Sequence, residues 1–174
     1  AAVFDGTRWL GWERPPIEYI YAVQLFYELI KDGKIRIANK IKEPVTVHDP
    51  CSVVRSRGLG DMLRFVIRAT CEDFRDVTPN YEHNYCCCAG GGVINYGPPW
   101  KPVRMTGGRI KIKQFKATGA KIVIAPCHSC HKTIEEMSDY YKAGLHVMFA
   151  SELLVKTMEI PEHLKISKEP DQEH

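Results

Sequence analysis

Apolar and polar residues alternate along the chain with two different periods, which predict helices separated by short strands. Short β-branched or apolar runs predict strands, the last of them weak, at 45–49, 121–125, 146–150 and 75–79. Apolar residues at helical spacing predict helices over 15–33, 60–74, 105–118, 128–144 and 152–158. This alternation is typical of an α/β fold, with a mainly parallel sheet of about four strands and flanking helices in Rossmann-like layers.

Short polar residues and glycines mark the ends of several of these helices. Asp61 and Ser151 are expected N-caps, because their side-chain oxygens can accept hydrogen bonds from the free N–H groups of a first turn. Gly33 and Gly119 are expected at C-terminal ends, where the backbone turns left-handed at little cost to glycine. These residues therefore predict where four of the helices begin or end.

The predicted elements divide the chain into three parts. Residues 1–43 carry one helix and are expected to form an N-terminal docking or lead-in segment. Residues 44–164 contain every predicted strand and are expected to form one cysteine-rich domain. The polar tail 165–174 is expected to be disordered. Because the first residue is Ala rather than Met, the sequence is interpreted as a processed form or a fragment.

Composition and charge are those of an ordinary globular protein and argue against several classes. Of the 174 residues, 44% are hydrophobic and 26% charged, which suits a single domain with a real core. No apolar run approaches the roughly 18–20 residues that cross a bilayer, so no membrane span is expected. The net charge is only +3, and basic residues are scattered among acidic ones, so no nucleic-acid partner is expected.

Seven cysteines are the feature that points to chemistry. They are too sparse for a secreted disulfide scaffold, and their odd, clustered arrangement favours metal or redox chemistry in a reducing compartment, the cytoplasm. Cys51 and Cys127 each follow a predicted strand, and Cys130 lies in the first turn of the next helix. Three cysteines at 86–88 lead into glycines at 90–92, which let the backbone approach a bulky inorganic group. The three loops therefore predict a metal or iron–sulfur site at one edge of the sheet.

Three stretches, HDPCSVVRSRG, YCCCAGGGV and IAPCHSCHKTI, together resemble the cysteine-rich CCG domain of heterodisulfide reductases over residues 44–160. Within that family the sequence is most similar to the catalytic iron–sulfur subunits of membrane redox complexes associated with dissimilatory sulfite reductase. The resemblance implies a non-cubane [4Fe–4S] cluster held by Cys51, Cys86, Cys87, Cys127 and Cys130. Cys88 stands where the family has glycine, so it is a sixth ligand, a bystander or an exchange partner of Cys87.

The resemblance also implies an activity and partners. The domain would reductively cleave a heterodisulfide, or a disulfide or trisulfide on a small sulfur-carrier protein, within an anaerobic electron-transfer complex. Electrons would come from other iron–sulfur or membrane subunits, which could also hold the chain at the cytoplasmic face of the membrane. Leaving thiolates need protons, so His48, His128 and His131 are the candidate proton donors. Cys71 lies within a helical period and is expected to be a buried apolar thiol.

Two other functions are compatible with some of the same cysteines. A structural zinc site needs only four of the clustered thiols, but it leaves the adjacent cysteines and the glycine loop unexplained. A thiol–disulfide oxidoreductase could use Cys127 and Cys130 alone, with the helix N-terminus activating one thiol. That function gives no role to Cys51 or to the three adjacent cysteines. An assay of iron, sulfide and zinc separates the three hypotheses.

Overall fold

A three-stranded parallel sheet forms the centre of the molecule, in the order β1-β2-β3. The structure is a computed structural model, which describes residues 6, 9–11, 13, 19–90 and 92–164. The strands are Val45–Val47, Ile122–Ile124 and His146–Met148. Most of their side chains are buried, because helices cover both faces of a parallel sheet. The predicted α/β fold with a mainly parallel sheet is confirmed.

The weak strand candidate at 75–79 is not a strand. The chain meets β1 just before it, at one isolated bridge between Phe74 and Val45. Beyond this bridge the Val77 N–H donates to the Asp76 carboxylate at 2.9 Å rather than to a neighbouring strand. Because a side chain takes the hydrogen bond that a ladder would need, the described part of the sheet has three strands rather than about four.

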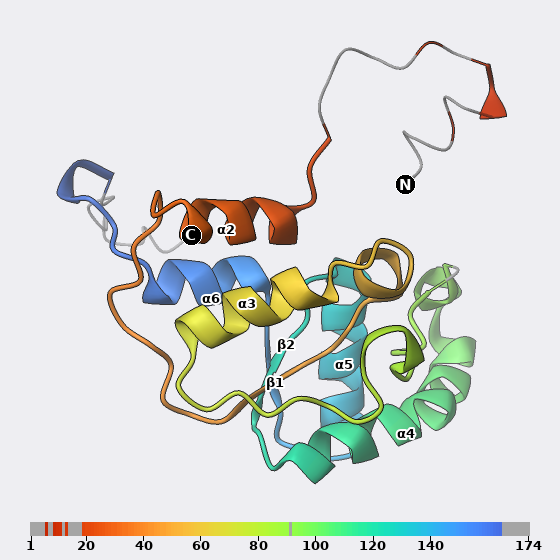
Figure 1. The fold of residues 1–174 in the computed structure, drawn as a ribbon. Helices are drawn as coiled ribbons and strands as arrows, with labels where there is room; N and C mark the ends of the chain where they lie inside the picture. Colours follow the sequence, from red (N-terminus) through yellow and green to blue (C-terminus); the bar gives the residue numbers. More distant parts are fainter. Residues whose placement is uncertain (1–5, 7–8, 12, 14–18, 91, 165–174) are drawn as a thin grey trace, which may run out of the picture.

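α-Helices flank the sheet in two layers (Figure 1). In one layer α3 packs against α2 and α6, which are Gly60–Thr70, Ala22–Lys31 and Ala150–Thr157 respectively. In the other layer α4 packs against α5, which are Lys101–Thr118 and His128–Tyr140. A short π-helix, η1, covers Cys51–Arg55 directly after β1. Turns of this kind often occur at functional sites.

The glycine signals for helix ends are confirmed, whereas the N-cap predictions are wrong. Gly33 and Gly119 take left-handed φ values of +68° and +71° just after α2 and α4. Asp61 lies inside the first turn of α3, where its carboxylate accepts the hydroxyl of Tyr81 at 2.7 Å. The N-cap of α6 is Phe149, so Ser151 falls within the helix.

Two predictions fall on residues outside the described ranges. They are the first part of the helix expected over 15–33, at 15–18, and the disordered tail expected at 165–174. Within the described part, the N-terminal helix begins at Ala22. It ends close to the predicted position, at Lys31. Helix α2 of the expected N-terminal segment packs on α3.

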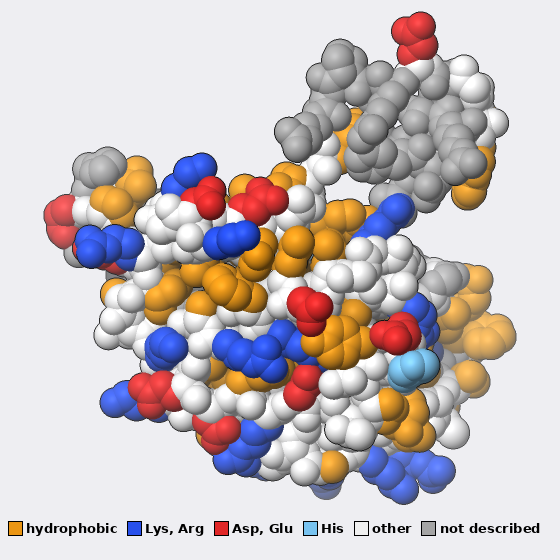
Figure 2. Space-filling model, in the orientation of Figure 1, with side chains coloured by type: hydrophobic (Ala, Val, Ile, Leu, Met, Phe, Trp, Pro, Cys, Tyr) orange, Lys and Arg blue, Asp and Glu red, His pale blue; other side chains and the backbone are white. Residues whose placement is uncertain are grey.

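The surface carries both signs of charge. On the face drawn in Figure 2, Lys and Arg side chains lie among Asp and Glu side chains, without a stripe of one sign. Apolar side chains gather between α2 and the helices beneath it on the same face. In the ranges that the structure describes, no helix combines the length and the apolar character needed to cross a bilayer.

Candidate metal centre

The cysteine loops follow the carboxyl ends of two neighbouring strands. The His48 N–H donates to the Ile124 carbonyl at 2.9 Å, which continues the β1–β2 pairing by one residue beyond β1. Cys51 then opens η1, and Cys127 lies three residues after the end of β2. Because β1 and β2 are parallel neighbours, both loops leave the same edge of the sheet, as predicted.

Two sulfur atoms from different loops lie in contact at this edge. The Sγ atoms of Cys87 and Cys130 are 3.1 Å apart, and both residues are buried. Cys127 is the N-cap residue of α5, and Cys130 lies in its first turn. The Cys130 thiol and the N–H groups of Cys130 and Ser129 donate to Cys127, and these interactions lower the pKa of Cys127 to about 5 against the effect of burial. The same contacts and burial raise the pKa of Cys130.

The three adjacent cysteines have different surroundings. Cys86 is exposed, Cys87 is buried and Cys88 is half-buried with a left-handed φ of +61°. Hydrogen bonds from the thiols of Cys87 and Cys88, and from the Cys88 N–H at 3.2 Å, lower the pKa of Cys86. The contact with Cys130 lowers the pKa of Cys87, but its hydrogen bond to Cys86 and its burial prevail and raise that pKa to about 12. Thiol contacts therefore link these cysteines to those of α5.

Arg55 fastens the Cys51 loop to the segment that precedes the three cysteines. Its guanidinium donates to the carbonyl oxygens of Glu82 at 2.7 Å and Asn84 at 2.6 Å, and approaches Cys51 Sγ at 3.6 Å. Cys51 itself is exposed, and among the described contacts its sulfur meets Arg55 rather than another cysteine. The sequence interpretation missed Arg55. Its position four residues after Cys51 is the signal that could have found it.

His48 is buried beside the sulfur atoms. One of its ring nitrogens lies within 4.8 Å of the sulfurs of Cys87 and Cys130. Burial, and next the positive charge of Lys111, lower the pKa of His48 well below its usual value, so the ring is neutral. Its Nε2 has no hydrogen-bond partner among the described residues, whereas Nδ1 faces the Asn84 amide nitrogen at 3.4 Å.

A buried hydrogen-bond chain assigns the tautomer of this ring. Lys111 Nζ donates to Asn84 Oδ1 at 2.6 Å, and this hydrogen bond sets the orientation of the Asn84 amide. The Asn84 Nδ2 group then donates to the Asp49 carbonyl at 3.0 Å and faces Nδ1 of His48. Nδ1 is therefore the acceptor and the proton sits on Nε2. In this arrangement neither nitrogen offers a free lone pair, which makes His48 a donor to the centre rather than a metal ligand.

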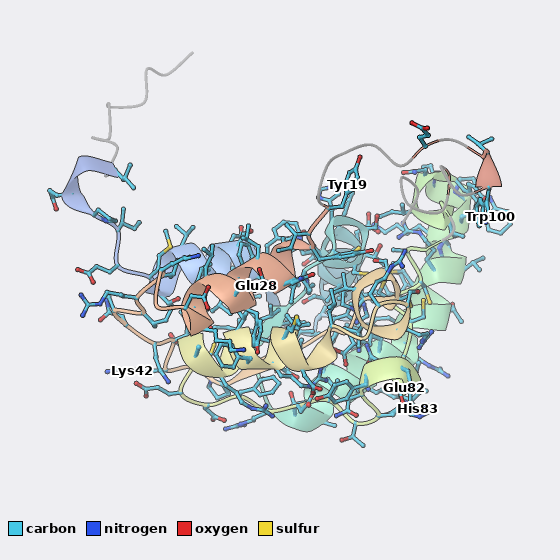
Figure 3. All side chains as sticks on the ribbon, turned by 45° about the horizontal axis from the view of Figure 1, so that its top comes forward. Tyr19, Glu28, Lys42, Glu82, His83 and Trp100 are labelled. Carbon is cyan, nitrogen blue, oxygen red and sulfur yellow. The ribbon has the colours of Figure 1, made fainter. Side chains whose placement is uncertain are left out.

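The other two candidate proton donors stack on one aromatic ring. The His131 ring lies parallel to Phe149, with centroids 4.0 Å apart, and the exposed His128 ring lies parallel to it at 6.1 Å. His131 Nδ1 also lies 3.4 Å from the Glu135 carboxylate. The described side-chain contacts of His131 are therefore with Phe149 and Glu135 rather than with the cysteine sulfurs. His83, beside the three cysteines in sequence, projects outward from the edge of the molecule (Figure 3).

The remaining cysteine and the glycine loop complete the site. Cys71 is buried at the end of α3, bonded to the Thr70 hydroxyl, and burial raises its pKa, so the predicted apolar thiol is confirmed. Gly90 and Gly92 have open space where a side chain would begin, and Gly92 takes a left-handed φ of +78°. Gly91 lies outside the described residues. A set of sulfur donors beside an unpartnered histidine N–H fits a bound iron–sulfur group.

Comparison with known proteins agrees with these observations. Residues 45–135, slightly more than half of the chain, match the family described as CCG, cysteine-rich domain. Over 91% of its length the chain is 31% identical to a subunit of the dihydromethanophenazine:CoB–CoM heterodisulfide reductase from Methanosarcina barkeri. It is 28% identical, over 74% of its length, to the Hdr-like menaquinol oxidoreductase iron–sulfur subunit of Archaeoglobus profundus.

A more distant relative extends the same group. The chain is 24% identical, over 82% of its length, to the EtfAB:quinone oxidoreductase of Syntrophomonas wolfei. No solved structure matches the chain significantly. The matched segments span 38%, 24% and 21% of these three relatives, so the chain corresponds to less than two fifths of each. The relatives named here are oxidoreductases or their subunits, and two are named as subunits of larger enzymes.

Proposed function

Because the chain belongs to the CCG family of cysteine-rich domains, we propose that it is an iron–sulfur redox domain that reductively cleaves a disulfide-type bond. The observation that carries this proposal is the buried contact of Cys87 with Cys130, at 3.1 Å between sulfurs from two separate loops. Neighbouring Cys86 and Cys127 have depressed pKa values, which suits thiolate ligands. These four cysteines and Cys51 would hold a non-cubane [4Fe–4S] cluster.

The reaction joins one-electron carriers to a two-electron bond cleavage. A bound cluster would supply single electrons in turn, and two electrons with two protons convert one disulfide into two thiols. His48 would donate a hydrogen bond from Nε2 to the sulfur atoms, because its ring is neutral and its other nitrogen accepts from Asn84. His128 and His131, stacked on Phe149, are proposed as the proton donors.

The substrate and partners follow from the relatives. The heterodisulfide reductase of Methanosarcina barkeri indicates a heterodisulfide, and a disulfide or trisulfide on a small sulfur-carrier protein offers the same bond. Two relatives are named as subunits, so electrons would reach this domain from iron–sulfur or membrane subunits of one complex. Seven free cysteines suit the reducing cytoplasmic side of a membrane, where we place that complex.

Anaerobic reconstitution of this chain with iron and sulfide tests the proposal. Wild-type protein should bind about four irons with matching sulfide and develop broad visible absorption. The Cys87→Ala variant should lose the iron and the absorption. The Cys71→Ala variant is the matched control, because it removes one buried thiol that meets Thr70 rather than the other cysteines, and it should keep both.

The alternative functions give different results in the same experiment. A structural zinc site would yield colourless protein with one zinc per chain after exposure to both metals. A thiol–disulfide oxidoreductase would retain activity after chelation and would depend on Cys127 and Cys130 alone. A Cys87→Ala variant with an unchanged spectrum would contradict our ligand assignment.

A further inference from the structure

A lysine side chain is buried beneath the cysteine centre. Lys111 lies on α4 with a fully buried side chain, although lysine is almost never buried without a partner. Its ammonium donates to the amide oxygens of Asn84 and Gln114, each at 2.6 Å, and lies 4.6 Å from the centre of the Phe115 ring. Among the described residues no carboxylate lies within ion-pair distance of it. Neutral groups alone therefore hold a buried cation in direct contact.

Asp49 and the cysteines of the centre are the acidic groups that act on this cation from a distance. Burial lowers the pKa of Lys111 to about 7, while Asp49 and then Cys87, Cys130 and Cys86 act to raise it. The Asp49 carboxylate accepts from Arg64 through both of its oxygens at 2.9 Å, and Arg64 also pairs with Asp76. Among the groups that act on Lys111, the cysteines are the ones that would gain negative charge when they bind metal as thiolates.

The route from Lys111 to the sulfur atoms is short and buried. Asn84 accepts from Lys111 and faces His48, and a ring nitrogen of His48 lies within 4.8 Å of the Cys87 and Cys130 sulfurs. All of these groups are buried, so water screens their charges weakly. A positive charge at this position acts strongly on whatever negative group the thiolates bind.

We propose that Lys111 is the built-in counter-cation of the cysteine centre and sets the reduction potential of the metal group bound there. Each electron added to an iron–sulfur group increases its negative charge. A fixed cation stabilises that reduced state relative to the oxidised state, so Lys111 raises the potential. It is a positioning residue, since it touches Asn84 rather than the sulfurs in the described contacts. This inference rests on the proposed function for the identity of the bound group.

The test compares two lysines on the same helix. Lys111→Met removes the buried charge and keeps an unbranched chain, whereas Lys113→Met removes an exposed charge two residues away. After anaerobic reconstitution, the midpoint potential of the cluster is measured by redox titration monitored by electron paramagnetic resonance. Lys111→Met should disfavour reduction at least tenfold, which for one electron is about 59 mV toward negative potential. Lys113→Met should leave the potential close to that of the wild type.

A purely structural role predicts a different pattern. If Lys111 only held Asn84 and Gln114 in place, the metal-free Lys111→Met protein would melt below the wild type, and a reconstituted sample would keep the wild-type potential. Under our proposal the reconstituted variant has a lower potential whatever its melting temperature, because loss of the two hydrogen bonds would lower the melting temperature in either case. An unchanged potential in the reconstituted Lys111→Met protein overturns the proposal.

If the folded Lys111→Met protein does not hold the cluster, a charge-preserving variant shows whether the lost charge or the changed side-chain shape is the cause. Lys111→Arg should then retain the cluster if positive charge is what matters. Failure of both variants to hold iron would show that the shape of the lysine chain matters, and would also overturn the proposal. The proposed function itself fails separately, when wild-type protein takes up no iron and sulfide.

Discussion

At the residue scale, the backbone conformation of Cys88 explains why the family has glycine at this position. It has a φ of +61°, a left-handed conformation that glycine adopts easily and other residues rarely. Glycine is therefore favoured at this position by the left-handed backbone conformation, whether or not a metal is bound. The Cys88 sulfur lies against α4, where a methyl group on Gly107 would come within 3.1 Å of it. We infer that this sulfur packs beside the centre rather than binding metal.

Replacing Cys88 by glycine should therefore preserve the centre and stabilise the fold. Relief of the left-handed strain outweighs the entropy cost of glycine, and we expect a gain of roughly 0.5–1 kcal/mol in the free energy of unfolding. Urea unfolding of the metal-free protein measures this gain, and an iron assay after reconstitution measures the centre. Cys86→Gly is the control that should lose iron. Loss of iron from Cys88→Gly would instead make Cys88 a ligand.

At the element scale, the close packing of α4 on α5 depends on one glycine. A methyl group at Gly108 would overlap the sulfur of Met137, a fully buried residue of α5. The neighbouring Gly107 is exposed and faces the sulfur of Cys88. Glycine is unfavourable inside a helix, so its presence at 108 reflects this contact rather than local preference. The contact brings α4, and Lys111 with it, close to the cysteine-bearing α5.

Alanine at these two glycines should have unequal effects. Gly108→Ala should lower the free energy of unfolding by about 1–3 kcal/mol, because the added methyl group overpacks a closed core. Gly107→Ala should be nearly neutral, because a helix-propensity gain of up to about 1 kcal/mol offsets the crowding of Cys88. Chemical denaturation of both metal-free variants measures the difference. Equal stabilities would show that α4 and α5 can move apart without cost.

Elements that are determined by residues close in sequence were predictable, whereas features that depend on contacts across the fold were not. The buried strands at β1, β2 and β3 and the glycine ends of α2 and α4 were predictable, because apolar runs and left-handed turns leave local signals. Asp61 and Ser151 were misplaced as caps, since a cap depends on where the first turn closes. The roles of Arg55 and Lys111 depend on contacts across the fold, so the sequence concealed them. The cysteine loops were predictable because parallel strands end at one edge.

At the scale of the whole molecule, a buried neutral histidine makes the fold sensitive to acid. Burial holds the pKa of His48 well below 6.5, whereas the unfolded chain binds a proton near its ordinary pKa. The unfolded state therefore takes up more protons as the pH falls below about 6.5, and the folded state loses relative stability. This contribution is fully present above that pH and is lost on acidification.

Unfolding measured at two pH values should expose this contribution. Between pH 7.5 and 5.5, wild-type metal-free protein should lose about 1.4 kcal/mol more than the His48→Gln variant, since one unfolded-state protonation is removed. His83→Gln replaces an exposed histidine and should follow the wild type. Urea titrations give the free energies at each pH. Parallel behaviour of wild type and His48→Gln would mean that His48 takes up its proton over the same pH range in the folded and unfolded protein.

The separation of the cysteines along the chain bears on how the domain acquires the right metal during biosynthesis. Cys127 and Cys130 share one helix turn, so they can meet as soon as α5 forms. The contact of Cys87 with Cys130 joins residues 43 positions apart in sequence, and such non-local contacts form more slowly than local ones. A newly synthesised chain can thus bind zinc through two thiols before its iron site is complete. Timing of cofactor delivery relative to folding, as much as ligand identity, would decide whether the mature domain is active.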